Sequence, residues 1–163
     1  MKKLLWILLA LAVLAYFGLL PFHASDVAQL LPVETVIVTR SGTQYRVDVG
    51  AGVEGVGDSV RAALDALREH ASGIVFFQTA EQVVVSEEAT DAVEEIVTDE
   101  QFRPSAGLYR TDETALRAHD LTPYFRTRHT PLTVGRARAA LTEGAPVCLP
   151  LLVRADGGYD VLA

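Results

Sequence analysis

An uncharged apolar segment at residues 4–22 is the feature that most restricts how this chain can fold and where it can reside. It directly follows Lys2 and Lys3, and polarity returns only at His23. With a helical rise of roughly 1.5 Å per residue, it would reach almost across the ~30 Å hydrocarbon core of a bilayer, and it exceeds the usual ~7–15 residues of a signal-peptide core. We predict a single-pass anchor within residues 1–24, and the positive-inside rule places the rest of the chain outside the cytoplasm.

Cleavage of this segment is the alternative. The best candidate site precedes Ser25, where Phe22 and Ala24 occupy the two positions that favour small residues, and only Ala24 fits. No cysteine lies near this boundary, so attachment through a lipidated cysteine is not expected. Residues 25–32 are interpreted as a linker and residues 33–163 as one extracytoplasmic domain, because that length is close to the modal domain size.

The predicted outer domain is acidic. Without Lys2 and Lys3 the 14 basic residues become 12, against 21 acidic residues, which gives about nine net negative charges. Nucleic acids and anionic lipid surfaces bind through basic footprints, so neither is expected as the main partner. Cys148 is the only cysteine and can form no internal disulfide, so the domain must rely on its hydrophobic core.

Alternating and helical periodicities predict the first elements of the domain. Residues 33–39 and 43–49 are β-rich runs with a turn between them, typical of a hairpin with one buried face. The glycine-rich residues 50–57 are interpreted as a loop that leads to a helix with Asp58 or Ser59 as its N-cap. The apolar stripe of this helix comprises Val60, Ala63, Leu64, Leu67 and Ala71.

A second strand and helix follow in the sequence. Residues 74–77 and 82–85 predict either two short strands or one bent strand. Ser86 is predicted to cap a second helix, and Glu87 and Glu88 suit the positive end of its dipole. Its apolar stripe comprises Ala89, Ala92, Val93, Ile96 and Val97.

The later elements complete an α/β pattern. Residues 106–110 predict a strand, followed by a short helix capped by Thr111 or Asp112 that continues through Leu116. The polar, proline-bearing residues 121–133 are interpreted as a loop, and residues 134–143 as a helix that ends at a glycine.

A closing hairpin is predicted at residues 147–153 and 159–162, with Pro150 confining its first strand to a sheet edge or a bulge. Hairpins at both ends favour a mixed sheet with flanking helices over an all-parallel sheet.

The segment Gly50-Ala51-Gly52-Val53-Glu54-Gly55 matches the dinucleotide pattern G-x-G-x-x-G and lies between a predicted strand and helix. The preceding strand alternates in polarity instead of being wholly apolar, and the helix begins only at Asp58. A flexible glycine loop is therefore the favoured interpretation.

The cysteine and histidine residues do not form a recognisable catalytic or metal-binding motif. Cys148 lies in an apolar stretch without a charged neighbour, which predicts a small buried core residue. His70, His119 and His129 have no spacing that places two on one helical face, and no zinc-binding pattern is present. They are interpreted as solvated residues at helix ends or in loops.

An acidic cluster extends over residues 87–100. It lacks the spacing of a calcium loop, and paired catalytic carboxylates normally come from separate elements. A solvated helix face is predicted. The cluster comprises Glu87, Glu88, Asp91, Glu94, Glu95, Asp99 and Glu100.

Several segments carry a family resemblance. Residues 62–67 form an alanine-leucine helix, residues 73–89 an apolar segment, a strand and an acidic turn, and residues 98–105 a turn with acidic, arginine and proline residues. A helix and glycine at residues 140–144 and a leucine-proline step at residues 149–151 follow. In this order they resemble the N-terminal part of the Ger(x)C family, the C subunits of bacterial spore germinant receptors.

The resemblance implies a scaffold or receptor-accessory role and supplies no catalytic residue. Family members are usually lipoproteins and continue through further domains, whereas this sequence has no lipid-attachment cysteine and stops at Ala163. A helical anchor in place of the lipid is expected.

We therefore predict a membrane-anchored, non-enzymatic extracytoplasmic α/β domain with no cofactor and no metal, held at a bacterial or spore membrane through residues 4–22. Its expected partners are proteins similar to germinant-receptor subunits. The alternative is an exported small-ligand-binding protein or enzyme with its site near residues 50–57.

Overall fold

A seven-stranded mixed sheet is the central element of the computed structural model, which describes residues 30–50, 52–113, 116–125, 130–155 and 158–162. The strand order is β4-β3-β2-β6-β7-β8-β9. The strands are β2 (Thr35–Ser41), β3 (Gln44–Asp48), β4 (Glu54–Gly57), β6 (Gln82–Ser86), β7 (Gly107–Thr111), β8 (Leu151–Ala155) and β9 (Gly158–Leu162). Strands β2, β6, β7 and β8 run parallel, whereas β3, β4 and β9 are antiparallel to their neighbours. The predicted α/β class with a mixed sheet is confirmed.

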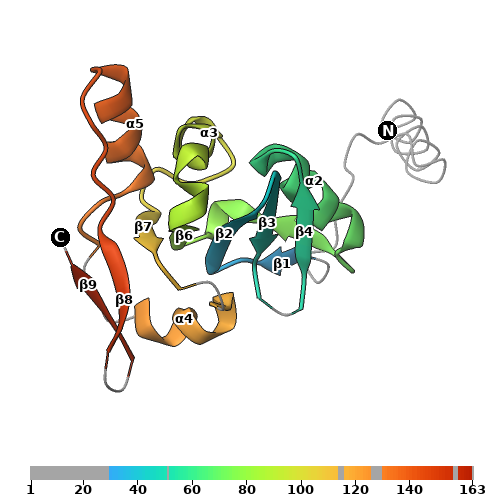
Figure 1. The fold of residues 1–163 in the computed structure, drawn as a ribbon. Helices are drawn as coiled ribbons and strands as arrows, with labels where there is room; N and C mark the ends of the chain where they lie inside the picture. Colours follow the sequence, from blue (N-terminus) through green and yellow to red (C-terminus); the bar gives the residue numbers. More distant parts are fainter. Residues whose placement is uncertain (1–29, 51, 114–115, 126–129, 156–157, 163) are drawn as a thin grey trace, which may run out of the picture.

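Helices cover both faces of this sheet. Figure 1 shows α2 (Val60–His70), α3 (Val93–Thr98) and α5 (Val134–Thr142) on one face and α4 (Ala118–Phe125) on the other. Val36 and Val38 of β2 pack on the three-helix side, and Ile37 between them packs with residues of α4. The central strands are therefore apolar on both faces, as parallel strands between helices require.

Helix α2 confirms its sequence prediction. Ser59 is the N-cap, and its side chain accepts a hydrogen bond from the backbone nitrogen of Ala62. Glu95 of α3 also accepts bonds from the backbone nitrogens of Val60 and Arg61, which satisfies two more donors of the first turn. The buried residues of the helix are Val60, Ala63, Leu64 and Leu67, whereas Ala71 of the predicted stripe is the C-cap and is only partly buried.

Strand β4 shows that the loop predicted for residues 50–57 was wrong over its second half. Residues Glu54–Gly57 pair with β3 and lie against α2. A Cβ on Gly55 would overlap the backbone oxygen of Ala63 and lie 2.5 Å from the backbone nitrogen of Leu67. Glycine is needed here because the helix backbone packs directly on the strand.

Residues 30–32 were predicted to be linker but form strand β1 (Leu30–Pro32). This strand pairs in parallel with β5 (Ile74–Phe76) in a separate two-stranded ribbon. Residues 74–76 and 82–85 thus belong to two strands in different sheets, and Phe77 begins a 3₁₀ turn between them. The predicted anchor lies outside the described residues, and among the described residues no helix is long and apolar enough to cross a membrane.

The second predicted helix is confirmed in position but is made of two parts. A 3₁₀ helix, η3 (Glu87–Ala92), precedes α3, and the whole predicted stripe is buried. Ser86 occupies the N-cap position, yet its side chain makes no capping hydrogen bond, so this detail of the prediction was wrong. Ser86 instead lines a cavity at the end of β6.

Helix α4 replaces part of the loop predicted at residues 121–133. Leu121 and Phe125 are one helical turn apart and are both buried on the second face of the sheet, where Phe125 stacks on Tyr109 with ring centroids 4.9 Å apart. Tertiary burial therefore overrides the presence of Pro123 inside the helix. The short helix predicted after Thr111 was wrong in its described part, because residues 112–113 and 116–117 are not helical, and residues 114–115 lie outside the described residues.

The C-terminal elements largely follow the predictions. Thr133 caps α5, and Gly144 follows the helix with a φ of 70°. Strands β8 and β9 form the predicted hairpin, but β8 begins only at Leu151 and lies between β7 and β9 instead of at an edge. Pro150 is tolerated because it precedes the strand, where its carbonyl accepts a hydrogen bond from the backbone nitrogen of Arg110.

Candidate functional site

A cavity of about 590 Å³ lies beside the carboxyl ends of β2 and β6, on the face of the sheet that α4 covers. Ile37 and Leu116 contribute apolar surface to its wall, and Ser86, the last residue of β6, lines it as well. In open α/β sheets, ligands bind outside the carboxyl ends of the parallel strands. We take this cavity, hereafter the carboxyl-end pocket, as the candidate site.

The Ser86 hydroxyl is the most informative group in the pocket. The residue is 2% exposed, and its Oγ makes no hydrogen bond within the part of the chain that the structure describes. A buried hydroxyl without a partner costs free energy, so such a group in a native fold calls for an explanation. A ligand in the carboxyl-end pocket would supply the missing partner.

Three arginines line the same pocket, although the chain as a whole is acidic. Arg46 and Arg117 both pair with Glu54, at 3.6 Å and 3.5 Å. Arg40 pairs with Asp91 and lies over the ring of Tyr45. Each guanidinium carries five N–H donors, so these contacts leave donors that a ligand can use.

Two carboxylates also line the pocket. Asp48 is buried, and it accepts hydrogen bonds from the backbone nitrogens of Gly50 at 2.8 Å and Ala118 at 3.4 Å. It therefore joins the end of β3 to the start of α4 and gives the pocket wall a fixed shape. Glu88 also lines the pocket and is exposed.

Tyr45 adds a polar link beside the pocket. Its hydroxyl donates a hydrogen bond to Asp91 Oδ2 at 2.8 Å. This bond raises the pKa of the Tyr45 hydroxyl above its ordinary value, and burial adds to the shift. Asp91 thus holds both Tyr45 and Arg40 at the end of the β2–β3 hairpin.

The G-x-G-x-x-G segment has a structural explanation. Gly50 and Gly52 have φ of 81° and 72° in the turn between β3 and β4, and Gly55 allows the close approach of α2. The segment therefore serves a tight turn and a strand–helix contact. The rival site expected near residues 50–57 stays a prediction: none of these residues that the structure describes lines the carboxyl-end pocket, and residues 52–56 line a separate depression of about 390 Å³ together with Ala66 and His70.

Cys148 is exposed, so the prediction of a buried core residue was wrong. It lies before β8 and lines a groove of about 570 Å³ together with Val93, Leu141 and Leu149. We call this the α3–α5 groove. The apolar neighbours in sequence were a misleading signal, because Val147 and Leu149 pack against the core and line the groove while Cys148 between them is exposed.

The other predicted candidates lie apart from the pocket. His70 and His119 are exposed, at the end of α2 and in α4, as predicted, and His129 lies outside the described residues. The acidic cluster is mostly solvated, but Asp99 is buried and accepts a bond from the backbone nitrogen of Gln101. Among the described residues no group of three histidine, cysteine or acidic side chains could hold a metal ion.

Comparison with protein-family models, curated proteins and solved structures finds no significant match for this chain. The site is therefore argued from its own geometry. A sequence signal for it did exist: Arg40-Ser41 and Ser86 each end an apolar strand, and parallel strands bring such ends to one edge of the sheet.

Proposed function

We propose that this chain is a membrane-held extracytoplasmic module, without a catalytic role of its own, that binds a small anionic ligand in the carboxyl-end pocket. The unpartnered, buried hydroxyl of Ser86 is the observation that carries the proposal. The membrane attachment rests on the apolar residues 4–22. This proposal develops the ligand-binding alternative, with the site at the ends of β2 and β6.

The ligand class follows from the donors around the pocket. Guanidinium groups favour phosphate and carboxylate oxygens, which they bind in bidentate geometry. Arg40, Arg46 and Arg117 supply such groups, and the Ser86 hydroxyl adds a short-range donor at the buried end. Asp48 and Glu88 can accept hydrogen bonds, so a ligand that carries hydroxyls besides its anionic group would fit best.

Ser86→Ala tests this proposal because it is expected to raise the stability of the free protein and to weaken anion binding. Without a ligand, the change is expected to raise the free energy of unfolding by up to ~1–3 kcal/mol, because it removes a buried hydroxyl that lacks a partner. With phosphate or citrate as probe, it is expected to weaken binding about tenfold, since a hydrogen bond to a charged group contributes ~1.5–3 kcal/mol. Both effects are measured by thermal unfolding of the full chain in detergent while each anion is titrated.

Ser105→Ala is the matched control, because Ser105 is an exposed serine outside the pocket. Sodium chloride at equal ionic strength corrects for screening. The proposal is wrong if neither anion stabilises the wild-type chain more than chloride does. It is also wrong if Ser86→Ala and Ser105→Ala reduce anion binding equally.

Docking to a germinant-receptor-like membrane subunit is the second candidate function. The specific observation in its favour is the α3–α5 groove, where Leu141, Val147 and Leu149 are at least partly exposed. Apolar surface rimmed by polar residues is typical of protein contact sites. Asp91 and Glu94 of the same groove provide such a rim.

Cys148 allows a direct test of this second candidate, because it is the only thiol in the chain and lies in the groove. A thiol-attached photo-crosslinker at Cys148 is expected to capture a many-spanning membrane subunit in native membranes. The control carries the crosslinker at Leu162→Cys in a Cys148→Ser background. Equal capture from both positions, or none from Cys148, would contradict docking at this groove.

A further inference from the structure

The β1–β5 ribbon has two different faces. Its register pairs Leu30 with Ile74, Leu31 with Val75 and Pro32 with Phe76, and partners in a parallel pair share a face. Val75 is buried in the main core, and Leu31 packs against that core. The ribbon therefore fixes which residues point away from the domain.

The outward face of the ribbon is entirely apolar. It carries Leu30, Pro32, Ile74 and Phe76, with Ile74 46% and Phe76 39% exposed. A strand pair with one buried face normally presents polar residues on the other face. Scattered exposed apolar residues need no explanation, but paired positions on both strands form a continuous patch.

The position of this patch in the sequence, close to the predicted anchor, indicates which surface covers it. Leu30 follows the end of the predicted anchor, residue 22, by only seven intervening residues. Seven residues span at most roughly 25 Å, so an inserted anchor holds β1 and its partner β5 close to the membrane surface. A lipid surface is therefore the apolar surface nearest to the patch.

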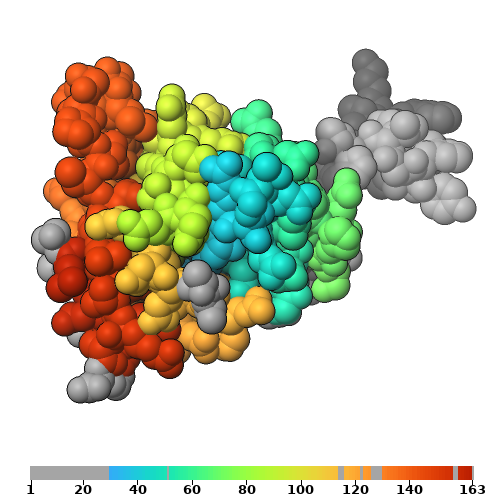
Figure 2. All heavy atoms as spheres, viewed as in Figure 1, coloured from blue at the N-terminus to red at the C-terminus, as the bar shows by residue number. Residues whose placement is uncertain are grey.

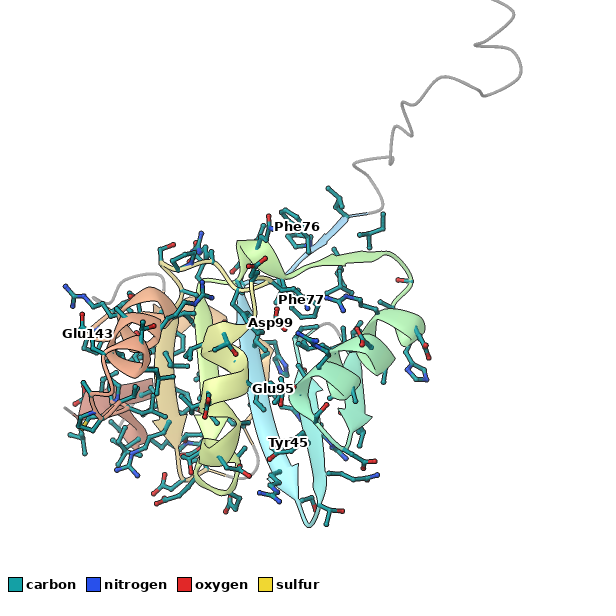
Figure 3. The ribbon with its side chains drawn as sticks, turned by 90° about the horizontal axis from the view of Figure 1, so that it is seen from above. Tyr45, Phe76, Phe77, Glu95, Asp99 and Glu143 are labelled. Carbon is teal, nitrogen blue, oxygen red and sulfur yellow. The ribbon has the colours of Figure 1, made fainter. Side chains whose placement is uncertain are left out.

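The orientation of the domain agrees with this placement. Figure 3 shows Phe76 beside β1 at one end of the domain and Tyr45 at the opposite end, while Phe77 lies further inside. Tyr45 belongs to the β2–β3 hairpin next to the carboxyl-end pocket. In Figure 2, the green residues around β5 and the red residues of β8 and β9 lie on opposite sides of the molecule.

We infer that the outward face of the β1–β5 ribbon contacts the interfacial region of the bilayer in which the chain is anchored. The inference rests on the anchor assumed in the proposed function, but not on the ligand. The contact is apolar, which is compatible with an acidic domain because it needs no basic footprint. It directs the carboxyl-end pocket away from the membrane.

Fluorescence quenching by lipids tests the contact on the full chain. Trp6 is the only tryptophan, so Trp6→Phe gives a silent background into which Phe76→Trp is introduced. The chain is reconstituted into phosphatidylcholine vesicles with or without brominated acyl chains. The tryptophan at position 76 is expected to be quenched at least about twofold more by brominated lipid than a control tryptophan, with little dependence on salt.

Leu162→Trp in the same background is the control. Leu162 is 51% exposed, more than Phe76, but lies on β9 at the far side of the domain. Equal quenching at the two positions would overturn the inference while leaving the anchor and the ligand pocket intact. Release of the chain by alkaline carbonate would overturn it as well, by removing the anchor on which it rests. Unchanged thermal unfolding of each variant verifies that quenching is measured on the folded domain.

Discussion

Leu64→Asp is expected to remove a large part of the stability of the domain. Leu64 is 0% exposed and lies in the middle of α2, within the main core. The substitution places a carboxylate where no partner is available and removes a packed side chain, at a cost of about 4 kcal/mol or more. Domains of this size have a total stability of only ~5–15 kcal/mol. The urea midpoint, followed by circular dichroism, measures the loss.

Leu141→Asp is the matched control for this change. Leu141 also lies on a helix, α5, but is 36% exposed. Substitutions at exposed positions usually change the stability by no more than about 0.5 kcal/mol. Similar urea midpoints for Leu64→Asp and Leu141→Asp would show that α2 does not pack on the sheet as described.

Gly55→Ala is expected to destabilise the domain by about 3 kcal/mol, although it adds only a methyl group. The new Cβ would overlap the Ala63 backbone oxygen and lie 2.7 Å from Leu67 Cβ, so α2 or β4 must move. A helix backbone cannot yield as a flexible side chain can, and forcing extra volume into a packed interface costs ~1–3 kcal/mol, occasionally more. A lower thermal midpoint with an unchanged helical spectrum is the expected result.

Gly52→Asn is the comparison variant that distinguishes a packing clash from a loss of backbone freedom. Gly52 has a φ of 72°, but no atom lies within 4 Å of the position that a Cβ would take there, and asparagine tolerates this conformation better than most residues. A small loss of stability is expected here. If Gly55→Ala proves as mild as Gly52→Asn, then β4 and α2 are not in close contact, and the glycines serve only the turn.

Local patterns in the sequence were sufficient for the elements whose own residues specify them. The spacing of Val60, Ala63, Leu64 and Leu67 predicted α2, and Asp58 or Ser59 was predicted as its start, which is at Ser59. The two hairpins at the ends of the domain and the mixed sheet followed from alternation and turn residues. The residues that form each of these signals lie close together in the sequence, so the element can be predicted without knowledge of the tertiary structure.

Other features were decided by contacts between distant segments. Pro123 argued against a helix, yet α4 forms because Leu121 and Phe125 are buried on the sheet. Cys148 has apolar neighbours but remains exposed in a groove. Local composition does not report which surface a residue will meet, and only the assembled layers determine burial.

The sequence by itself determined the class of the fold, the acidity of the domain and the apolar segment that predicts an anchor. Only the tertiary structure decided where the candidate functions lie. Ser86 and Arg117 are distant in the sequence but line the same pocket. Parallel pairing brings the end of β6 beside β2, and packing brings the segment before α4 over these strand ends. Likewise, the pairing of β1 with β5 creates the apolar face of the ribbon. Both sites depend on strand order, which arises from long-range burial and not from local periodicity.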